Sequence, residues 1–156
     1  MRRIKNIVVH WSASPKTWGV SNLRDHHVNN NGWRDIGYHR VIIHPSSNEA
    51  RTHTDFWWEL VKQGRHLDND LYLDITEQGA HALGYNKNSV GICVIGNTDY
   101  SFHPWQQVAL LMTLQTFLTR FDLDADAIKC HRDVNTTLCP GEEIYNLVES
   151  FKRASS

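Results

Sequence analysis

The sequence lacks a surplus of charge, a long apolar segment and an even set of cysteines. Its 16 lysines and arginines nearly balance 17 aspartates and glutamates, so no overall positive field exists to hold nucleic acid or an anionic membrane. The longest apolar run, Val108 to Met112, is far shorter than the roughly 18 residues of a membrane span. Three cysteines are too few and odd in number for a disulfide framework, which indicates reduced thiols.

The N-terminal residues also lack the features of a targeting segment. Met1 to Asn6 do not lead into the apolar core of a signal peptide. We therefore expect a protein that is made in the cytoplasm without a signal peptide. The 156 residues match the length of about one domain, and no repeat or low-complexity stretch divides them. We expect a single domain over residues 1–156 that acts as a monomer.

The residue pattern predicts strands that alternate with helices. Three β-rich runs predict strands, over residues 4–10, 38–43 and 89–95, and the last is apolar enough to be central. Three helices are predicted, from a Ser21 cap to about residue 28, from Pro104 to about Phe121, and from Glu142 to about Phe151. Phe56–Val61 could be a short strand or a helical turn. This alternation indicates an α/β domain.

Three residues stand out among the candidates for chemistry. His10 is expected at the end of a strand, and His131 and Cys139 flank a loop-like segment before Pro140. A catalytic zinc ion takes three protein ligands and leaves a fourth position to water or substrate. Two histidines and one cysteine fit that count. However, the chain has ten histidines, so spacing alone selects this set only weakly.

Other interpretations of these residues stay open at this stage. A histidine at a strand end is commonly a surface residue, and a cysteine before proline is commonly a small buried group. His131 and Cys139 could also form a thiolate–imidazole pair for nucleophilic catalysis. Cys93 lies in an apolar run and is interpreted as a core thiol. Cys130 alternates to the opposite side from His131 and is interpreted as structural.

Four ordered sequence blocks resemble one family of enzymes. The blocks are Val8 to Ser14 (VVHWSAS), Ile36 to Ile43 (IGYHRVII), Gly79 to Gly96 (GAHALGYNKNSVGICVIG) and His131 to Gly141 (HRDVNTTLCPG). They resemble the N-acetylmuramoyl-L-alanine amidases of the T7-lysozyme type and the related peptidoglycan recognition proteins. The resemblance spans nearly the whole chain. The segment from Ser46 to Lys62 departs from the usual pattern and could be an insertion.

The resemblance implies a fold and a set of site residues. It implies one domain with a central mixed β-sheet and helices packed on both faces. It also implies one Zn²⁺ ion held by His10, His131 and Cys139. The family's active-site tyrosine falls on Tyr38. Thr137 stands where the phage lysozymes typically have a lysine, as it does in catalytic recognition proteins.

The resemblance also implies an activity. The expected reaction is zinc-dependent hydrolysis of the amide between the lactyl group of N-acetylmuramic acid and L-alanine in peptidoglycan. Tyr38 and Thr137 are then hydrogen-bond donors in catalysis, and His81 could line the substrate groove. Without a signal peptide, such an enzyme would reach the cell wall after release, as a phage endolysin does. The alternative is a module that binds peptidoglycan without cutting it. Phage lysozymes of this type can also bind a viral RNA polymerase, but no residue here supports that role.

Overall fold

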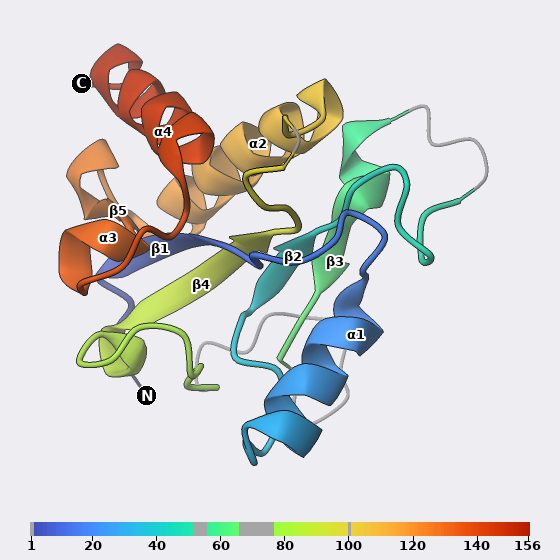
Figure 1. Cartoon of the computed structure of the whole chain (residues 1–156). Coiled ribbons are helices and arrows are strands. Elements are labelled where there is room, and N and C mark those ends of the chain that lie inside the picture. Colours follow the sequence, from blue (N-terminus) through green and yellow to red (C-terminus); the bar gives the residue numbers. More distant parts are fainter. Residues whose placement is uncertain (1, 52–55, 66–76, 100) are drawn as a thin grey trace.

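The computed structural model describes residues 2–51, 56–65, 77–99 and 101–156. They surround one five-stranded sheet with the order β3-β2-β4-β1-β5 (Figure 1). The strands are β1 (Asn6–Trp11), β2 (Arg40–Ile42), β3 (Val61–Gln63), β4 (Ser89–Val94) and β5 (Ile128–Cys130). β3 runs antiparallel to β2, whereas the other neighbouring pairs are parallel. The sheet is therefore mixed, as the sequence analysis expected.

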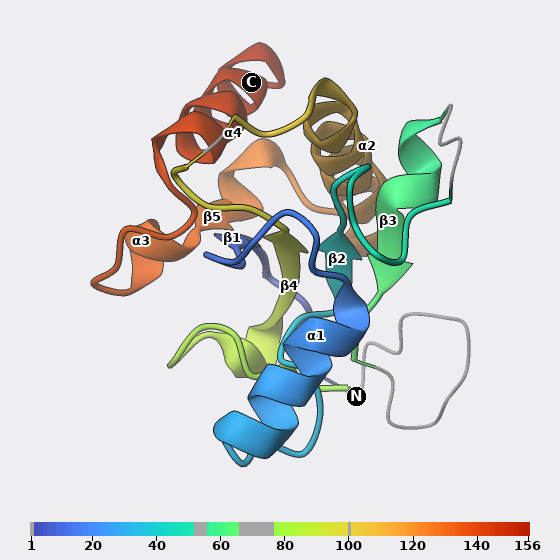
Figure 2. The same cartoon turned by 45° about the vertical axis from the view of Figure 1, so that its right-hand side comes forward.

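Helices cover both faces of this sheet. The longer ones, α2 (Pro104–Phe121) and α4 (Glu142–Ala154), lie together on one face. On the other face lies α1 (Val20–Asp25), which continues into a π-helical turn at His26–Asn30. Figure 2, turned by 45°, shows the same separation of α1 from α2 and α4. The short helix α3 (His131–Val134) follows β5 directly. None of the helices in these described ranges is long and apolar enough to cross a lipid bilayer.

The strongest sequence patterns are confirmed, and the weakest need correction. α2 has the predicted bounds because Pro104 favours the first helical position and Asp122 ends the helix in a left-handed conformation. The predicted Ser21 cap is wrong, since α1 begins at Val20. The carboxylate of Glu49 accepts hydrogen bonds from the backbone N–H groups of Val20 and Ser21. A residue from a distant loop therefore caps the N-terminus of this helix.

The segment that departed from the family pattern contributes both a turn and a strand. Trp57–Leu60 forms a 3₁₀ turn, and Val61–Gln63 then pairs with β2 as the edge strand. Leu60 is fully buried in the core. This part of the segment therefore covers core, while residues 52–55 lie outside the described ranges.

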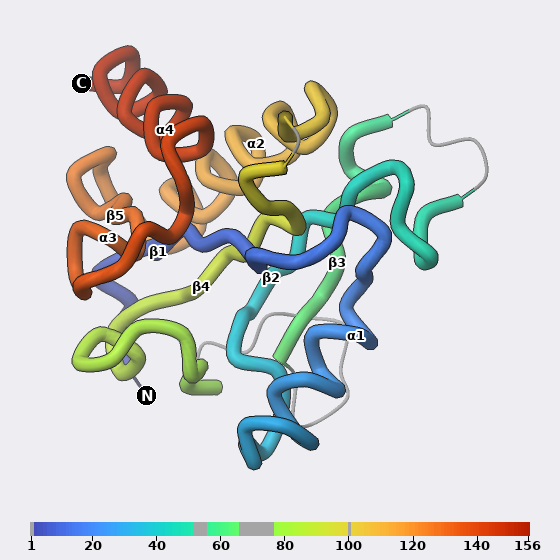
Figure 3. Tube along the Cα trace, in the orientation of Figure 1, coloured from blue at the N-terminus to red at the C-terminus, as the bar shows by residue number. Residues whose placement is uncertain are grey.

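The central strand β4 presents two different faces. All six of its residues are buried, and side chains alternate between the faces of a strand. Val90, Ile92 and Val94 point to the side that α2 and α4 cover. Ser89, Gly91 and Cys93 point to the side of α1, where they leave room above the sheet. In the tube of Figure 3, β1 runs beside β4, which brings His10 opposite Cys93.

A long-range contact at the N-terminus fixes the loop that precedes β4. The guanidinium of Arg2 donates hydrogen bonds to the backbone carbonyls of Asn86 and Ser89, more than 80 residues away. It also donates to the carbonyl of Glu77. The segment between Glu77 and Ser89 is therefore held at both ends, and His81 lies within it.

Candidate metal centre

His10 lies at the centre of a cluster of imidazoles above the sheet. It is the fifth residue of β1, and its side chain is only 1% exposed. Its Nδ1 atom lies 3.8 Å from the Sγ atom of Cys139, and its ring centroid is 4.5 Å from that of His131. Burial and the neighbouring His131 lower the pKa of His10 well below its usual value. The imidazole is therefore neutral and can offer a lone pair to a metal ion.

The structure brings together the three residues that the sequence selected. One ligand atom each from His10, His131 and Cys139 lies within 4.8 Å of the other two. With zinc bond lengths of about 2.0–2.1 Å to nitrogen and 2.3 Å to sulfur, tetrahedral ligands stand roughly 3.6 Å apart. The donor set and its spacing therefore fit a zinc ion. His131 is the first residue of α3 and not part of a loop, so a helical turn fixes its backbone.

The surroundings of Cys139 favour a metal ligand over a free nucleophile. Burial raises the pKa of its thiol to about 12, against a smaller effect of the Trp11 N–H group, which donates to Sγ. A nucleophilic cysteine needs a lowered pKa, so this site does not suit the thiolate–imidazole pair considered from the sequence. A bound metal cation removes the proton from a coordinating thiol. The ligand interpretation thus agrees with the burial of this residue.

The other two cysteines lie outside the cluster. Cys130 is fully buried in the core, opposite Val9 on β1. Cys93 is also fully buried, as expected from its apolar run, and its thiol lies against the Tyr38 hydroxyl. Cys93 therefore packs beneath the site without joining the candidate ligands.

Tyr38 reaches the cluster from the loop before β2. Its ring centroid is 5.1 Å from that of His10. Burial, and then the thiols of Cys93 and Cys139, raise the pKa of Tyr38 well above its usual value. The phenol therefore keeps its proton and can act as a hydrogen-bond donor next to the candidate metal ligands.

Thr137 lies in the turn that carries Cys139. Its Oγ1 atom accepts a hydrogen bond of 3.2 Å from the backbone N–H of Cys139. This bond fixes the turn and leaves the hydroxyl hydrogen available for another acceptor. The half-buried side chain thus combines a structural contact with a possible donor role.

Both candidate histidine ligands, His10 and His131, have polar neighbours that orient them, and of these neighbours the sequence analysis considered only His81, as a residue of the groove. The Nδ1 atom of His81 lies 2.9 Å from Nε2 of His10, and its Nε2 atom lies 3.2 Å from Oγ of Ser89. Nε2 of His131 lies 3.1 Å from Oδ1 of Asn135. The four-residue spacing between His131 and Asn135 could have indicated the second contact. No comparable local signal links residues 10, 81 and 89.

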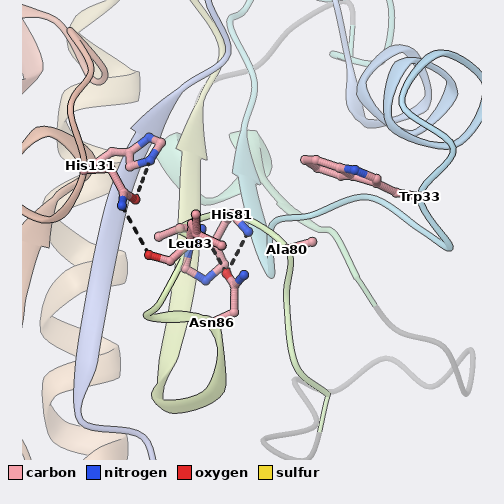
Figure 4. A pocket seen from close by; sticks show the side chains of 8 residues that line it. Trp33, Ala80, His81, Leu83, Asn86 and His131 are labelled. Carbon is pink, nitrogen blue, oxygen red and sulfur yellow. Dashed lines mark hydrogen bonds between the residues drawn. The ribbon is translucent and has the colours of Figure 1, made fainter.

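An open pocket of about 490 Å³ lies beside the cluster. Figure 4 shows His131 on one side, Trp33 on the other and His81 between them. The lining residues are Trp33, Ala80, His81, Ala82, Leu83, Asn86, His131 and Asn135. Its size is typical of pockets that bind small ligands. Trp33, which is 39% exposed, supplies the aromatic wall, whereas the sequence analysis had not considered this tryptophan.

Comparison with known proteins shows the family to which this chain belongs. The sequence profile described as N-acetylmuramoyl-L-alanine amidase matches residues 1–142. The endolysin of Enterobacteria phage T3 is 31% identical over 146 residues, which cover 88% of this chain and 81% of that protein. Peptidoglycan-recognition protein SC1a of Drosophila melanogaster is 28% identical over 138 residues, covering 87% of this chain and 63% of that protein. The solved structure of the N-acetylmuramoyl-L-alanine amidase LysC from Clostridium intestinale URNW superimposes with a TM-score of 0.72 at 22% identity, covering 96% of this chain and 85% of that chain. This chain therefore belongs to the N-acetylmuramoyl-L-alanine amidase family.

Proposed function

We propose that the chain is a zinc-dependent amidase that acts as an endolysin on bacterial peptidoglycan. Its substrate bond is the amide between the lactyl group of N-acetylmuramic acid and L-alanine of the stem peptide. The observation that carries the proposal is the cluster of His10, His131 and Cys139 within 4.8 Å beside an open pocket. The phage T3 endolysin, at 31% identity, supports the lytic role.

His10, His131 and Cys139 are the residues that would hold the ion. Zinc in a site with three protein ligands activates a water molecule for attack and polarises a carbonyl group as a Lewis acid. The pocket beside His131 would receive the part of the substrate that flanks the scissile amide. Its open shape suits a substrate that belongs to a large polymer.

Tyr38 and Thr137 would stabilise the charge that develops on the amide oxygen. Tyr38 keeps its proton because burial raises its pKa, so it donates a hydrogen bond and does not act as a base. The Thr137 hydroxyl would donate a hydrogen bond to the amide oxygen, while its Oγ1 atom still accepts the hydrogen bond from the backbone N–H of Cys139. A threonine brings no positive charge, so its share of the stabilisation is smaller than that of a charge-assisted bond from a lysine.

The direct test is mass spectrometry of purified sacculi after incubation with the protein. The samples are untreated, treated with a chelator, and treated with a chelator before zinc is restored. We expect free stem peptides that begin at L-alanine, lost with the chelator and recovered with zinc. Cleavage that persists in metal-free protein would contradict the proposal.

A Cys139→Ser variant sharpens this test. The side chain is 7% exposed and close in size to serine, so the fold should persist while zinc binding and hydrolysis are lost. Cys93→Ser is the matched control for zinc binding, because this buried thiol lies outside the candidate ligand set. Sacculi that bind wild-type protein and stay intact would instead indicate a recognition module without hydrolysis.

A further inference from the structure

A chain of hydrogen bonds leads from His10 into the sheet. Nε2 of His10 lies 2.9 Å from Nδ1 of His81, and Nε2 of His81 lies 3.2 Å from Oγ of Ser89. The Ser89 hydroxyl then lies 2.8 Å from the backbone carbonyl of Tyr85. His81 and Ser89 are 8% and 0% exposed, so water competes little for these bonds.

The direction of every hydrogen bond in this chain follows from its last member. The carbonyl of Tyr85 can only accept, so the Ser89 hydroxyl donates to it and accepts from Nε2–H of His81. His10 and His81 are only 1% and 8% exposed, and the neutral imidazole that such burial favours carries one hydrogen. Nδ1 of His81 is therefore an acceptor, and Nε2 of His10 must be the donor.

This direction places the lone pair of His10 on Nδ1. Nδ1 is the nitrogen that faces Cys139, at 3.8 Å from Sγ. The tautomer imposed from the sheet is therefore the one that a metal ion between His10 and Cys139 requires. His131 is oriented in the same way, because its Nε2 atom lies 3.1 Å from Oδ1 of Asn135.

The local backbone is built to hold the His81 ring in this place. The Oδ1 atom of Asn86 accepts hydrogen bonds from the backbone N–H groups of His81 and Ala82, at 2.8 and 2.9 Å. Gly91 lies beneath the ring, and a Cβ atom there would come within 2.6 Å of His81 Cγ. Both ring nitrogens of His81 are engaged, so neither is left to contact a ligand in the pocket.

We propose that His81, fixed by Ser89, is a positioning residue that holds His10 in the Nε2–H tautomer and so prepares the zinc site. This inference rests on the proposed zinc-dependent function. It gives His81 a different task from the contact with substrate that its place in the sequence suggested. Removal of the acceptor at residue 81 would leave Nε2–H of His10 unpaired and its ring free to change tautomer. Tight zinc binding would then be lost even though all three ligands remain.

The test compares two substitutions of nearly equal shape. In His81→Asn, the amide oxygen can occupy the place of Nδ1 and accept from His10, whereas His81→Leu offers no acceptor. Zinc affinity is measured for both by competition with a chromophoric chelator. We expect His81→Leu to lose about 10- to 100-fold in affinity, the range found when partners of metal ligands are removed. We expect His81→Asn to stay close to the wild-type affinity.

Two further measurements separate positioning from packing. Thermal unfolding of the metal-free variants checks that both substitutions disturb the fold equally. Nitrogen-15 NMR of the wild type should show hydrogens on Nε2 of both His10 and His81, and Ser89→Ala should allow His81 a mixture of tautomers. Equal zinc affinities for the Asn and Leu variants, or a hydrogen on Nδ1 of His10, would overturn the proposal. A wild-type protein that binds no zinc would instead refute the proposed function, and the inference would fall with it.

Discussion

The two faces of the sheet have different roles, although the same strands form both of them. On the face of α2 and α4, β4 contributes Val90, Ile92 and Val94 to a closely packed apolar core. On the face of α1, it contributes Ser89, Gly91 and Cys93, whose small side chains leave room for His81 and Tyr38. The first face contributes to stability through apolar burial. The second face positions polar groups, so substitutions on the two faces should have separable effects.

Removal of a large side chain from the apolar face should have the greatest effect on stability. Ile92 is fully buried, so Ile92→Ala should lower the free energy of unfolding by about 2–5 kcal/mol. Denaturant unfolding of the metal-free protein measures this change. Zinc affinity of the folded fraction should be unchanged. A large loss of zinc affinity in folded Ile92→Ala would show that the two faces are coupled.

Removal of a single hydroxyl on the other face should lower the rate of catalysis without a change in stability or zinc affinity. Tyr38→Phe deletes the donor beside His10 and keeps the ring that packs there. We expect the rate of sacculus hydrolysis to fall by about 10²- to 10³-fold, as for loss of one donor to a developing oxyanion. Zinc affinity and unfolding should stay close to wild type. A nearly normal rate would remove Tyr38 from the mechanism.

A methyl group added at Gly91 should disturb the site through His81. The new Cβ would lie 2.6 Å from the His81 ring, so the ring must shift from its present place beside His10. We expect Gly91→Ala to weaken zinc binding by about 10-fold or more, as for loss of a partner of a metal ligand. The neighbouring Val90→Ala, on the apolar face, is the matched control. It should lower stability and leave zinc affinity unchanged.

Mild acid should gradually lower the stability of the folded protein, because buried histidines lie on the face of α1. Burial lowers the pKa of His39 to about 4, whereas an unfolded histidine titrates near 6.5. Between these values the unfolded chain binds the additional proton, so stability is complete above pH 6.5 and falls as the pH decreases toward 4. His39 contributes at most about 1.4 kcal/mol per pH unit in this window. Unfolding of metal-free protein at pH 7.5, 6 and 5 measures the slope, and equal stability at all three would contradict it.

The sequence predicted elements well where local chemistry decides them. α2 follows from Pro104 and a long helical period, and β4 from an unbroken β-rich run. In contrast, β3 and β5 have three residues each, too few for a periodic signal. Their existence depends on pairing with β2 and β1, which a single sequence does not reveal. The start of α1 was mispredicted for the same reason, since its partner is the distant Glu49.

The candidate site divides in a similar way. The ligand types and the family blocks were visible in the sequence, and the structure brings His10, His131 and Cys139 together. The orientation of these ligands was not visible. Ser89 has no distinguishing feature in the sequence, and its importance arises only because β4 places its hydroxyl under His81. Residues that orient others are therefore the ones that a single sequence hides most effectively.

The position of the candidate ligands along the chain has a consequence for folding. His10 and Cys139 are 129 residues apart, and β1 reaches its place only between β4 and β5. Contacts of such large sequence separation form late, because the entropy of closing a long loop opposes them. An ion bound here would tie the N-terminal strand to the C-terminal third of the chain. Zinc uptake during refolding should therefore report the final step of folding, when the two ends of the chain have met.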